Sequence, residues 1–128
     1  PGRAGGGGFY DYPKGEKKHL WSQLKPLFEK PDVRWSVPEL QDRLLYRQAI
    51  ETARCLAEGV LTSVHDANIG SIFGIGFPAW TGGAMQFVYG TGVKPFLERA
   101  DELAQRHGAG FALDARAREA IARYQPGY

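Results

Sequence analysis

The segment SVPELQDRLLYRQAIETARCLAEG, residues 36–59, decides the fold. Ser36 and Glu39 form a capping-box pattern, in which the serine oxygen accepts a free backbone N–H and the glutamate reaches back. Pro38 is tolerated in a first helical turn, and Gly59 is placed near a helix end. One face is apolar, with Leu45, Ala49, Ala53, Leu56 and Val60. The other is charged, with Arg43, Arg47, Glu51, Arg54 and Glu58. This pattern predicts a long amphipathic helix over Pro38–Glu58.

Shorter helices are predicted on both sides of this segment. A helix over His19–Lys30 is indicated by leucines at helical spacing, although Pro26 weakens it. Asp66 is a good N-cap for a predicted helix that reaches Gly74. Thr81 is a candidate N-cap for a second short helix over Gly83–Tyr89. The last two helices are predicted from Pro95 to His107, closed by Gly108, and after a cap at Asp114, with Leu113, Ala117, Ile121 and Tyr124 aligned. No segment alternates like a β-strand, so the predicted fold class is all-α.

The first 15 residues are glycine-rich and then aromatic, which excludes a helix there. One interpretation is a flexible linker or a cloning scar. Phe9, Tyr10 and Tyr12 favour the other, a tail that packs its rings on a neighbouring surface, since a solvated linker has no use for them. We divide the chain into this tail, residues 1–15, a connector with a short helix, residues 16–35, and a helical domain, residues 36–128.

The composition of the 128 residues is that of a folded domain, with 43% apolar and 23% charged residues. A net charge of +2, with dispersed basic residues, gives no reason to expect nucleic acid as a partner. No apolar run approaches the ~20 residues of a membrane span, and the N-terminus does not resemble a signal peptide. Cys55 is expected to be a buried structural thiol, which favours a reducing compartment. Because the chain does not begin with Met, we expect a soluble piece of a longer protein.

Gly74–Ala79 superficially resembles a dinucleotide-binding fingerprint. That motif needs a preceding strand and a helix whose free N–H groups meet the phosphates. Here a helical segment precedes it, and Pro78 has no N–H to offer. We therefore expect a turn.

The remaining candidates for chemistry are isolated in the sequence. His19, His65 and His107 lack metal-ligand spacing, and no local carboxylate would orient a catalytic imidazole. His107 is expected to face the negative end of its helix dipole, and Glu102 to pair with Arg106. Ser63, Ser71 and Cys55 lack a recognisable base. We therefore assign no catalytic, no cofactor-binding and no metal-ligating residue.

Asp42 is the one charge that lies on the apolar side of the long helix, with Leu45, Tyr46 and Ala49. One interpretation is that an early acidic residue complements the helix N-terminus. The other is that its carboxylate points into an interface or pocket. The sequence leaves both open.

Several signatures occur here in the order typical of one family. Each is weak alone, but together, across roughly Gly2–Gly108, they resemble the C-terminal domain of the 3-hydroxyacyl-CoA dehydrogenases. They are Asp42–Leu45, Glu51–Val60, Asp66–Asn68, Gly74–Pro78 and Gly82–Gly83, with Gly2–Tyr12 similar to the glycine-rich Gly-Phe-Tyr-x-Tyr end of the same domain. The resemblance implies a helical domain of the 6-phosphogluconate dehydrogenase C-terminal-like type.

The order of these signatures resembles a multifunctional fatty-acid β-oxidation protein. In such proteins a Rossmann domain is followed by two helical repeats, so the chain resembles the tail of the first repeat, residues 1–15, and the whole second repeat, residues 36–128. The resemblance implies hydride transfer from a 3-hydroxyacyl-CoA to NAD in the parent, which can also carry an enoyl-CoA hydratase. It places the His–Glu pair and the NAD loop in the Rossmann domain, outside this chain. The family's substrate-contacting Asn of the first repeat is matched here by Asp42, so no catalytic role is carried over.

The resemblance implies a structural role, in which this repeat covers the first one as a built-in dimer partner. The expected partners are the first repeat and the Rossmann domain of the parent, and the isolated chain is expected to self-associate through the apolar residues around 70–78 and 80–87. The alternatives are a free-standing helical interaction module from the same family and an enzyme acting alone on a small acyl substrate. The expected compartment is the bacterial cytoplasm rather than a peroxisome, since the terminal Gln125–Tyr128 is no peroxisomal tripeptide.

Overall fold

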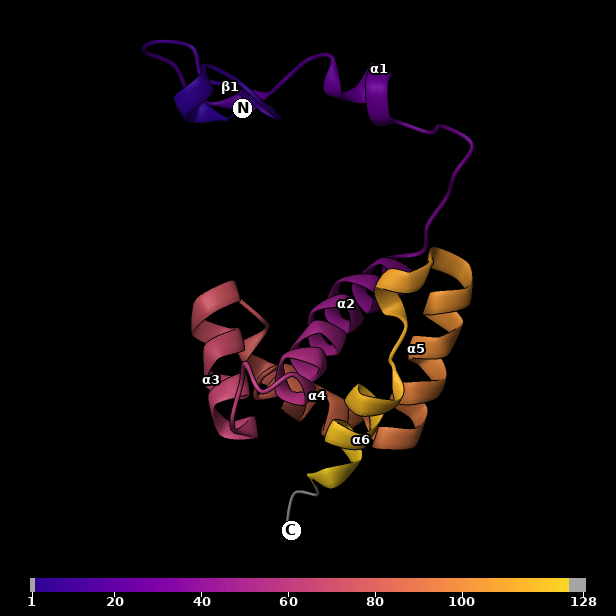
Figure 1. Cartoon of the computed structure of the whole chain (residues 1–128). Coiled ribbons are helices and arrows are strands. Elements are labelled where there is room, and N and C mark those ends of the chain that lie inside the picture. The colour runs from indigo at the N-terminus through magenta and orange to yellow at the C-terminus, as the bar shows by residue number, and fades with distance from the viewer. Residues whose placement is uncertain (1, 125–128) are drawn as a thin grey trace. The chain divides into compact units, whose positions relative to one another are not determined.

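A computed structural model describes residues 2–124 of the chain. The C-terminal residues 125–128, considered above for a targeting tripeptide, lie outside the described residues. The chain separates into two compact units, Pro1–Trp35 and Ser36–Tyr128, and each is described by itself (Figure 1).

The first unit is a small hairpin followed by one helical turn. It contains the 3-10 turn η1 (Arg3–Gly5), strands β1 (Tyr10–Asp11) and β2 (His19–Leu20), and helix α1 (Leu24–Phe28). The strands are antiparallel, with Tyr10 opposite Leu20. None of the described residues up to Trp35 is buried.

The sequence prediction for this unit was partly wrong. A helix was expected from His19 to Lys30, and no strand was expected anywhere. His19 and Leu20 instead pair with β1, and the N–H of Trp21 continues the ladder to the carbonyl of Phe9 (3.0 Å). Pairing with a partner distant in sequence therefore overrode the helical spacing of the leucines, and only residues 24–28 are helical.

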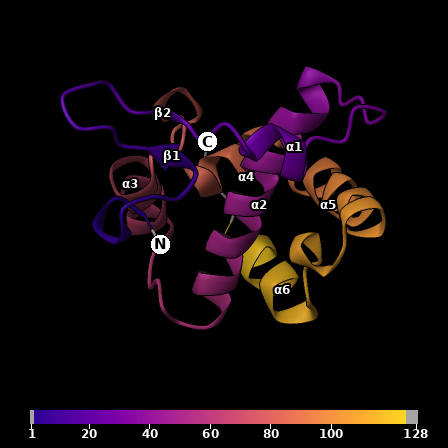
Figure 2. The same cartoon turned by 90° about the horizontal axis from the view of Figure 1, so that it is seen from above.

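The second unit is a helical domain built around one long central helix. Its elements are α2 (Val37–Ala57), α3 (Val64–Ile75), η2 (Ala79–Thr81), α4 (Ala84–Thr91), α5 (Val93–His107), η3 (Ala109–Phe111) and α6 (Ala115–Arg123). Seen from two directions, α3 and α5 lie on opposite sides of α2 (Figures 1 and 2). The prediction of a mainly helical fold is confirmed for the described residues, apart from the small hairpin.

The core of this unit forms where α2 meets α4, α5 and α6. Ala49 and Ala53 are buried as expected, but Tyr46 and Ile50 are buried too, so the apolar face is rotated from the predicted one. Val60 lies beyond the helix end and is exposed. Partners from the other helices are Met85, Val88, Phe96, Ala100, Leu103, Ala117 and Ile121.

Two of the predicted N-caps are confirmed. Ser36 accepts the N–H of Glu39 (3.3 Å), and Asp114 accepts the N–H of Ala117 (2.8 Å). Gly108 ends α5 as expected, with its N–H bonded to the carbonyl of Ala104 (2.9 Å).

Two other predicted caps were wrong. Ser63, not Asp66, caps α3, because the serine hydroxyl accepts the N–H of Asp66 (3.0 Å) and the helix begins earlier. Gly83, not Thr81, is the N-cap residue of α4.

Candidate functional site

A charged cluster joins the first turns of α2 to the middle and the end of α5. Arg99 lies at its centre, with Nε 2.9 Å from Asp42 and its terminal nitrogens 2.6 Å from Glu39 and 2.9 Å from Glu102. The second carboxylate oxygen of Glu39 lies 2.8 Å from His107 Nε2. The cluster therefore bridges α2 and α5 beside the stacked rings of Tyr46 and Phe96, whose centroids are 4.7 Å apart.

The cluster corrects two expectations from the sequence and contains one pair that the sequence did not predict. Glu39 does not complete the capping box with its side chain, because its carboxylate is engaged by Arg99 and His107. Glu102 pairs with Arg99 rather than with Arg106, which approaches Glu39 (3.5 Å). His107 has a carboxylate partner after all, supplied by a helix 68 residues earlier in the chain. No spacing rule within one helix could have found that pair.

The electrostatics of the cluster favour fixed charges over proton transfer. Hydrogen bonds with His107 and then with Arg99 lower the pKa of Glu39 to about 2. The contact with Glu39 likewise raises the pKa of the Arg99 guanidinium. A carboxylate that remains ionised through the physiological range is a poor general acid, and its lone pairs are already used. The geometry therefore supports a structural role for the His107–Glu39 pair.

The structure places the carboxylate of Asp42 in a contact between two helices of the same domain. Its carboxylate meets Arg99 of α5, so it lies in an interface, but one inside the domain. The side chain remains 37% exposed. Burial and the nearby charge of Asp42 also raise the pKa of Tyr46 to about 12, which keeps that phenol neutral.

The Asp-Ala-Asn and Gly-Gly signatures meet at the N-terminus of α4. The side-chain oxygen of Asn68 accepts the N–H groups of Met85 (3.0 Å) and Gln86 (2.9 Å). Ser71 accepts the N–H of Ala84 (3.0 Å) and donates to the carbonyl of Asn68 (2.8 Å). Two side chains of α3 thus satisfy three of the N–H groups that open the next helix.

The second glycine of the Gly-Gly pair allows α3 to approach this closely. At Gly83, φ is 113°, and an added Cβ would lie 2.5 Å from the Cα of Asn68. Only glycine combines that backbone angle with that contact. These signature residues therefore hold the scaffold together.

The turn expected over Gly74–Ala79 is shorter than predicted, because Gly74 and Ile75 still belong to α3 and Ala79 begins η2. Gly76 ends α3 with φ of 72°, and the N–H of Phe77 bonds to the carbonyl of Ser71 (2.9 Å). Gly74 lies in the last turn of α3, and the element after Pro78 is a single 3-10 turn. These residues do not fit a dinucleotide, because no helix N-terminus follows them directly to receive a phosphate.

Helix α3 and the turn η2 expose large apolar side chains. Phe73 is 83% exposed, Trp80 82%, Ile75 62% and Ile69 47%. We refer to these four residues together as the α3–η2 surface, although Ile75 lies on another side of α3 from Phe73 and lines a hollow with Cys55 and Leu61. The expected self-association through residues 70–78 and 80–87 remains a prediction, and the structure exposes only part of those segments, because Phe77 and Met85 are buried in the domain.

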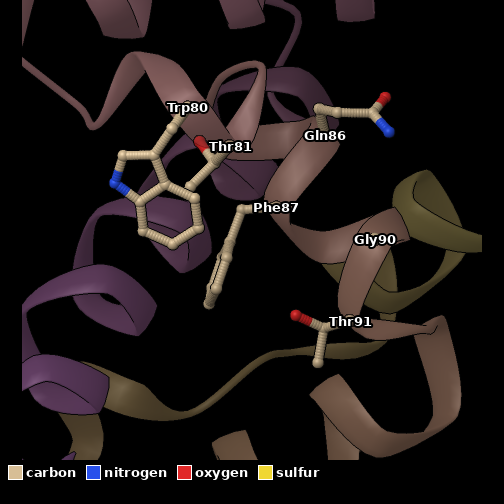
Figure 3. A pocket seen from close by; sticks show the side chains of 6 residues that line it. All are labelled: Trp80, Thr81, Gln86, Phe87, Gly90 and Thr91. Atoms are coloured by element: carbon tan, nitrogen blue, oxygen red, sulfur yellow. The ribbon is translucent and has the colours of Figure 1, made fainter.

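A shallow pocket of about 330 Å³ lies beside Trp80. It is lined by Trp80, Thr81, Gln86, Phe87, Gly90 and Thr91. In Figure 3 the ring of Phe87 lies between the indole of Trp80 and the side chain of Thr91. No titratable side chain lines it, so the pocket suits an apolar or aromatic group and offers no acid–base chemistry.

The other groups considered from the sequence lie apart from this pocket. Cys55 is half-buried and lines an apolar hollow of about 340 Å³ with Leu61 and Ile75, and desolvation raises the pKa of its thiol. Over residues 2–124, no group of three His, Cys, Asp or Glu side chains is arranged to hold a metal ion. Within the same residues, no helix is long and apolar enough to cross a membrane.

Comparison with known proteins shows homology to part of a much longer one. The chain is 36% identical over 112 residues to the fatty acid oxidation complex subunit alpha of Vibrio vulnificus, covering 87% of this chain and 16% of that subunit. It is 34% identical over 133 residues to the same subunit of Pseudomonas syringae, covering 97% of this chain and 18% of that subunit. The chain thus spans about a sixth of the length of the curated relatives it matches. No family model matches it.

Proposed function

We propose that residues 36–128 are the second C-terminal helical repeat of an NAD-dependent 3-hydroxyacyl-CoA dehydrogenase in a multifunctional β-oxidation protein. Residues 1–15 are then the tail of the first repeat, and residues 16–35 connect the two. The proposed fold type is that of the 6-phosphogluconate dehydrogenase C-terminal domain, and the proposed compartment is the bacterial cytoplasm. Homology to a region of the fatty acid oxidation complex subunit alpha supports this assignment.

The proposed role of the repeat is structural. Its partners are the first helical repeat and the Rossmann domain of the parent, where NAD binds and hydride transfer takes place. The observation that carries this role is the α3–η2 surface, because a domain that worked alone would have little reason to expose Phe73 and Trp80 almost fully. The engagement of Glu39 by Arg99 supports the view that this repeat adds no acid–base pair to the reaction.

A direct test is to express the region upstream of this chain in its gene and mix it with the chain. We expect the two polypeptides to form a 1:1 complex in native mass spectrometry, and the chain to raise the unfolding temperature of the upstream region. Failure to associate at tens of micromolar would argue against the structural role.

The alternative is a free-standing helical interaction module derived from the same family. The self-contained core between α2 and the helices α4, α5 and α6 favours it, since this unit buries apolar residues without help. The gene separates the two proposals. A Gly-x-Gly-x-x-Gly strand–helix unit upstream supports the dehydrogenase, and its absence supports the module.

A further inference from the structure

We infer that the hairpin of the first unit binds the phosphate group of a small soluble ligand between Arg3, Lys14 and Lys18. This site lies outside the helical domain and goes beyond the proposed function, which assigns residues 1–15 only to the end of the preceding repeat. It rests on a cavity, on the charge of its lining and on the rings that hold two of the cations.

The first step concerns the shape of the hairpin. A pocket of about 610 Å³ lies between the glycine-rich turn that begins at Arg3 and the loop that joins β1 to β2. Gly6 and Gly15 line it, and a Cβ built at either position would meet nothing within 4 Å. The space between the two loops is therefore open to a ligand, and its volume lies in the range of ordinary small-molecule sites.

The second step concerns the charge of the lining. Three cations, Arg3, Lys14 and Lys18, line the pocket together with one carboxylate, Glu16. No carboxylate among residues 2–124 forms an ion pair with any of the three cations. Positive charges that are gathered around a cavity and not compensated attract an anion, and Arg and Lys are both common phosphate ligands. The lining therefore favours an anionic ligand.

The third step concerns how the cations are held. The ammonium of Lys18 lies 4.7 Å from the centre of the Tyr10 ring, and the guanidinium carbon of Arg3 lies 6.0 Å from the centre of the Tyr12 ring. An aromatic face attracts a cation without neutralising its charge. The rings therefore restrict the two cations and leave their positive charge available to a ligand. This arrangement also gives a use to two aromatic residues that a plain linker would not need.

The fourth step selects the ligand. A carboxylate carries one negative charge, whereas a phosphate monoester carries about two at pH 7 and presents three acceptor oxygens. Three cationic donors around one pocket match the phosphate better. Glu16 in the same lining would repel an extended polyanion, so a compact phosphate-bearing molecule fits best.

The test is an NMR titration of the full, isotope-labelled 128-residue chain with pyrophosphate at constant ionic strength. We expect saturable shifts of the backbone N–H signals of Gly6 and Gly15, and no comparable shifts with chloride. Arg3→Ala and Lys18→Ala should each weaken binding by at least about fivefold.

Lys17→Ala is the matched control, because it removes the same charge from the neighbouring position and Lys17 does not line the pocket. It should weaken binding by less than about twofold. Glu16→Gln should tighten binding, since it removes the one negative charge of the lining. Equal losses for Lys17→Ala and Lys18→Ala would overturn the inference, because the hairpin would then attract anions through its net charge alone.

Sedimentation with vesicles of phosphatidylcholine and phosphatidic acid tests the other source of phosphate groups. Binding to these vesicles without saturable binding of pyrophosphate would also overturn the inference, in favour of a membrane surface. Unchanged signals of the helical domain and of the β1–β2 pairing would show that the variants fold, and Lys14→Ala tests the same site if another variant does not. Either negative result would leave the proposed function standing, because that function depends on binding to the upstream region.

Discussion

His107 Nε2 lies 2.8 Å from the carboxylate of Glu39, and this contact joins the last turn of α5 to the first turn of α2. The two side chains are only 10% and 13% exposed. Arg99 holds the other oxygen of the same carboxylate at 2.6 Å. The attachment of α5 to the start of α2 therefore depends on Glu39 being ionised.

The first prediction is that acid weakens the domain through Glu39. Its pKa is lowered from 4.5 to about 2 in the folded chain, so its contribution to the free energy of unfolding is fully present above the unfolded pKa. That contribution is lost as the pH falls from about 4.5 through 2. Glu39→Gln should lower the unfolding temperature at pH 7 and lower it progressively less below pH 4.5.

Thermal unfolding followed by circular dichroism at several pH values between 2 and 7 measures this difference. Glu98→Gln is the control, because Glu98 is exposed and only loosely paired with Lys94 (3.9 Å). It should leave the unfolding temperature nearly unchanged at every pH. A Glu39→Gln variant that differs from the wild type by the same amount at every pH would contradict the proposed linkage.

The second prediction concerns Asn68. Asn68→Leu leaves the N–H groups of Met85 and Gln86 without their acceptor, which should reduce the free energy of unfolding by about 1–3 kcal/mol. Asn68→Asp keeps an acceptor oxygen and places a negative charge at a helix N-terminus, so it should restore most of the loss. Urea unfolding of the three proteins gives the comparison. Equal losses for Leu and Asp would mean that the contact works through packing alone.

The third prediction contrasts Gly83, at the start of α4, with Gly90, inside the same helix. Gly83→Ala should destabilise the domain by more than about 2 kcal/mol, because its Cβ would collide with the backbone of Asn68 and its φ is 113°. Gly90→Ala, inside α4 with open space around it, should instead be neutral or stabilising by up to about 1 kcal/mol. Chemical unfolding decides between them, and a tolerated Gly83→Ala would show that α3 and α4 can separate at little cost.

The sequence predicted the elements whose signals are local. Ser36, Asp114 and Gly108 act on backbone groups within three or four residues, and the ends they mark were predicted to within one residue. The start of α3 was misplaced because Ser63 and Asp66 are both good caps, and only the geometry shows which one is used. Short-range chemistry thus predicts that a helix exists better than it predicts its first residue.

The functional features that depend on tertiary contacts were not predictable in the same way. Asn68 lies 17 residues from the amide that it caps, and Glu39 lies 68 residues from His107. Neither distance corresponds to a periodicity. The exposed surface could be anticipated, because the absence of charge around Phe73 and Trp80 is visible in the sequence itself.

The fourth prediction is that the isolated chain does not bind NADH. The glycines of residues 74–79 end a helix, and Pro78 lacks the N–H that a phosphate would need. Calorimetric titration with NADH should give only heats of dilution. Saturable binding with micromolar affinity would mean that this turn rearranges into a phosphate loop.

The last prediction compares how much Asp42 and Arg99, the two partners of one ion pair, contribute to the free energy of unfolding. Asp42→Asn keeps an oxygen that can accept from Arg99, and a pair with a 37% exposed carboxylate contributes little, so the loss in free energy of unfolding should be under about 1 kcal/mol. Arg99→Leu removes the cation shared by Glu39, Asp42 and Glu102 and should cost clearly more, because three carboxylates are then left close together.

Arg123→Leu, which breaks an exposed pair on α6, is the matched control and should have almost no effect. Urea unfolding gives the order of the three losses, and sedimentation shows whether assembly changes. An oligomeric state altered by Asp42→Asn would place Asp42 in a contact between molecules instead of the contact between α2 and α5.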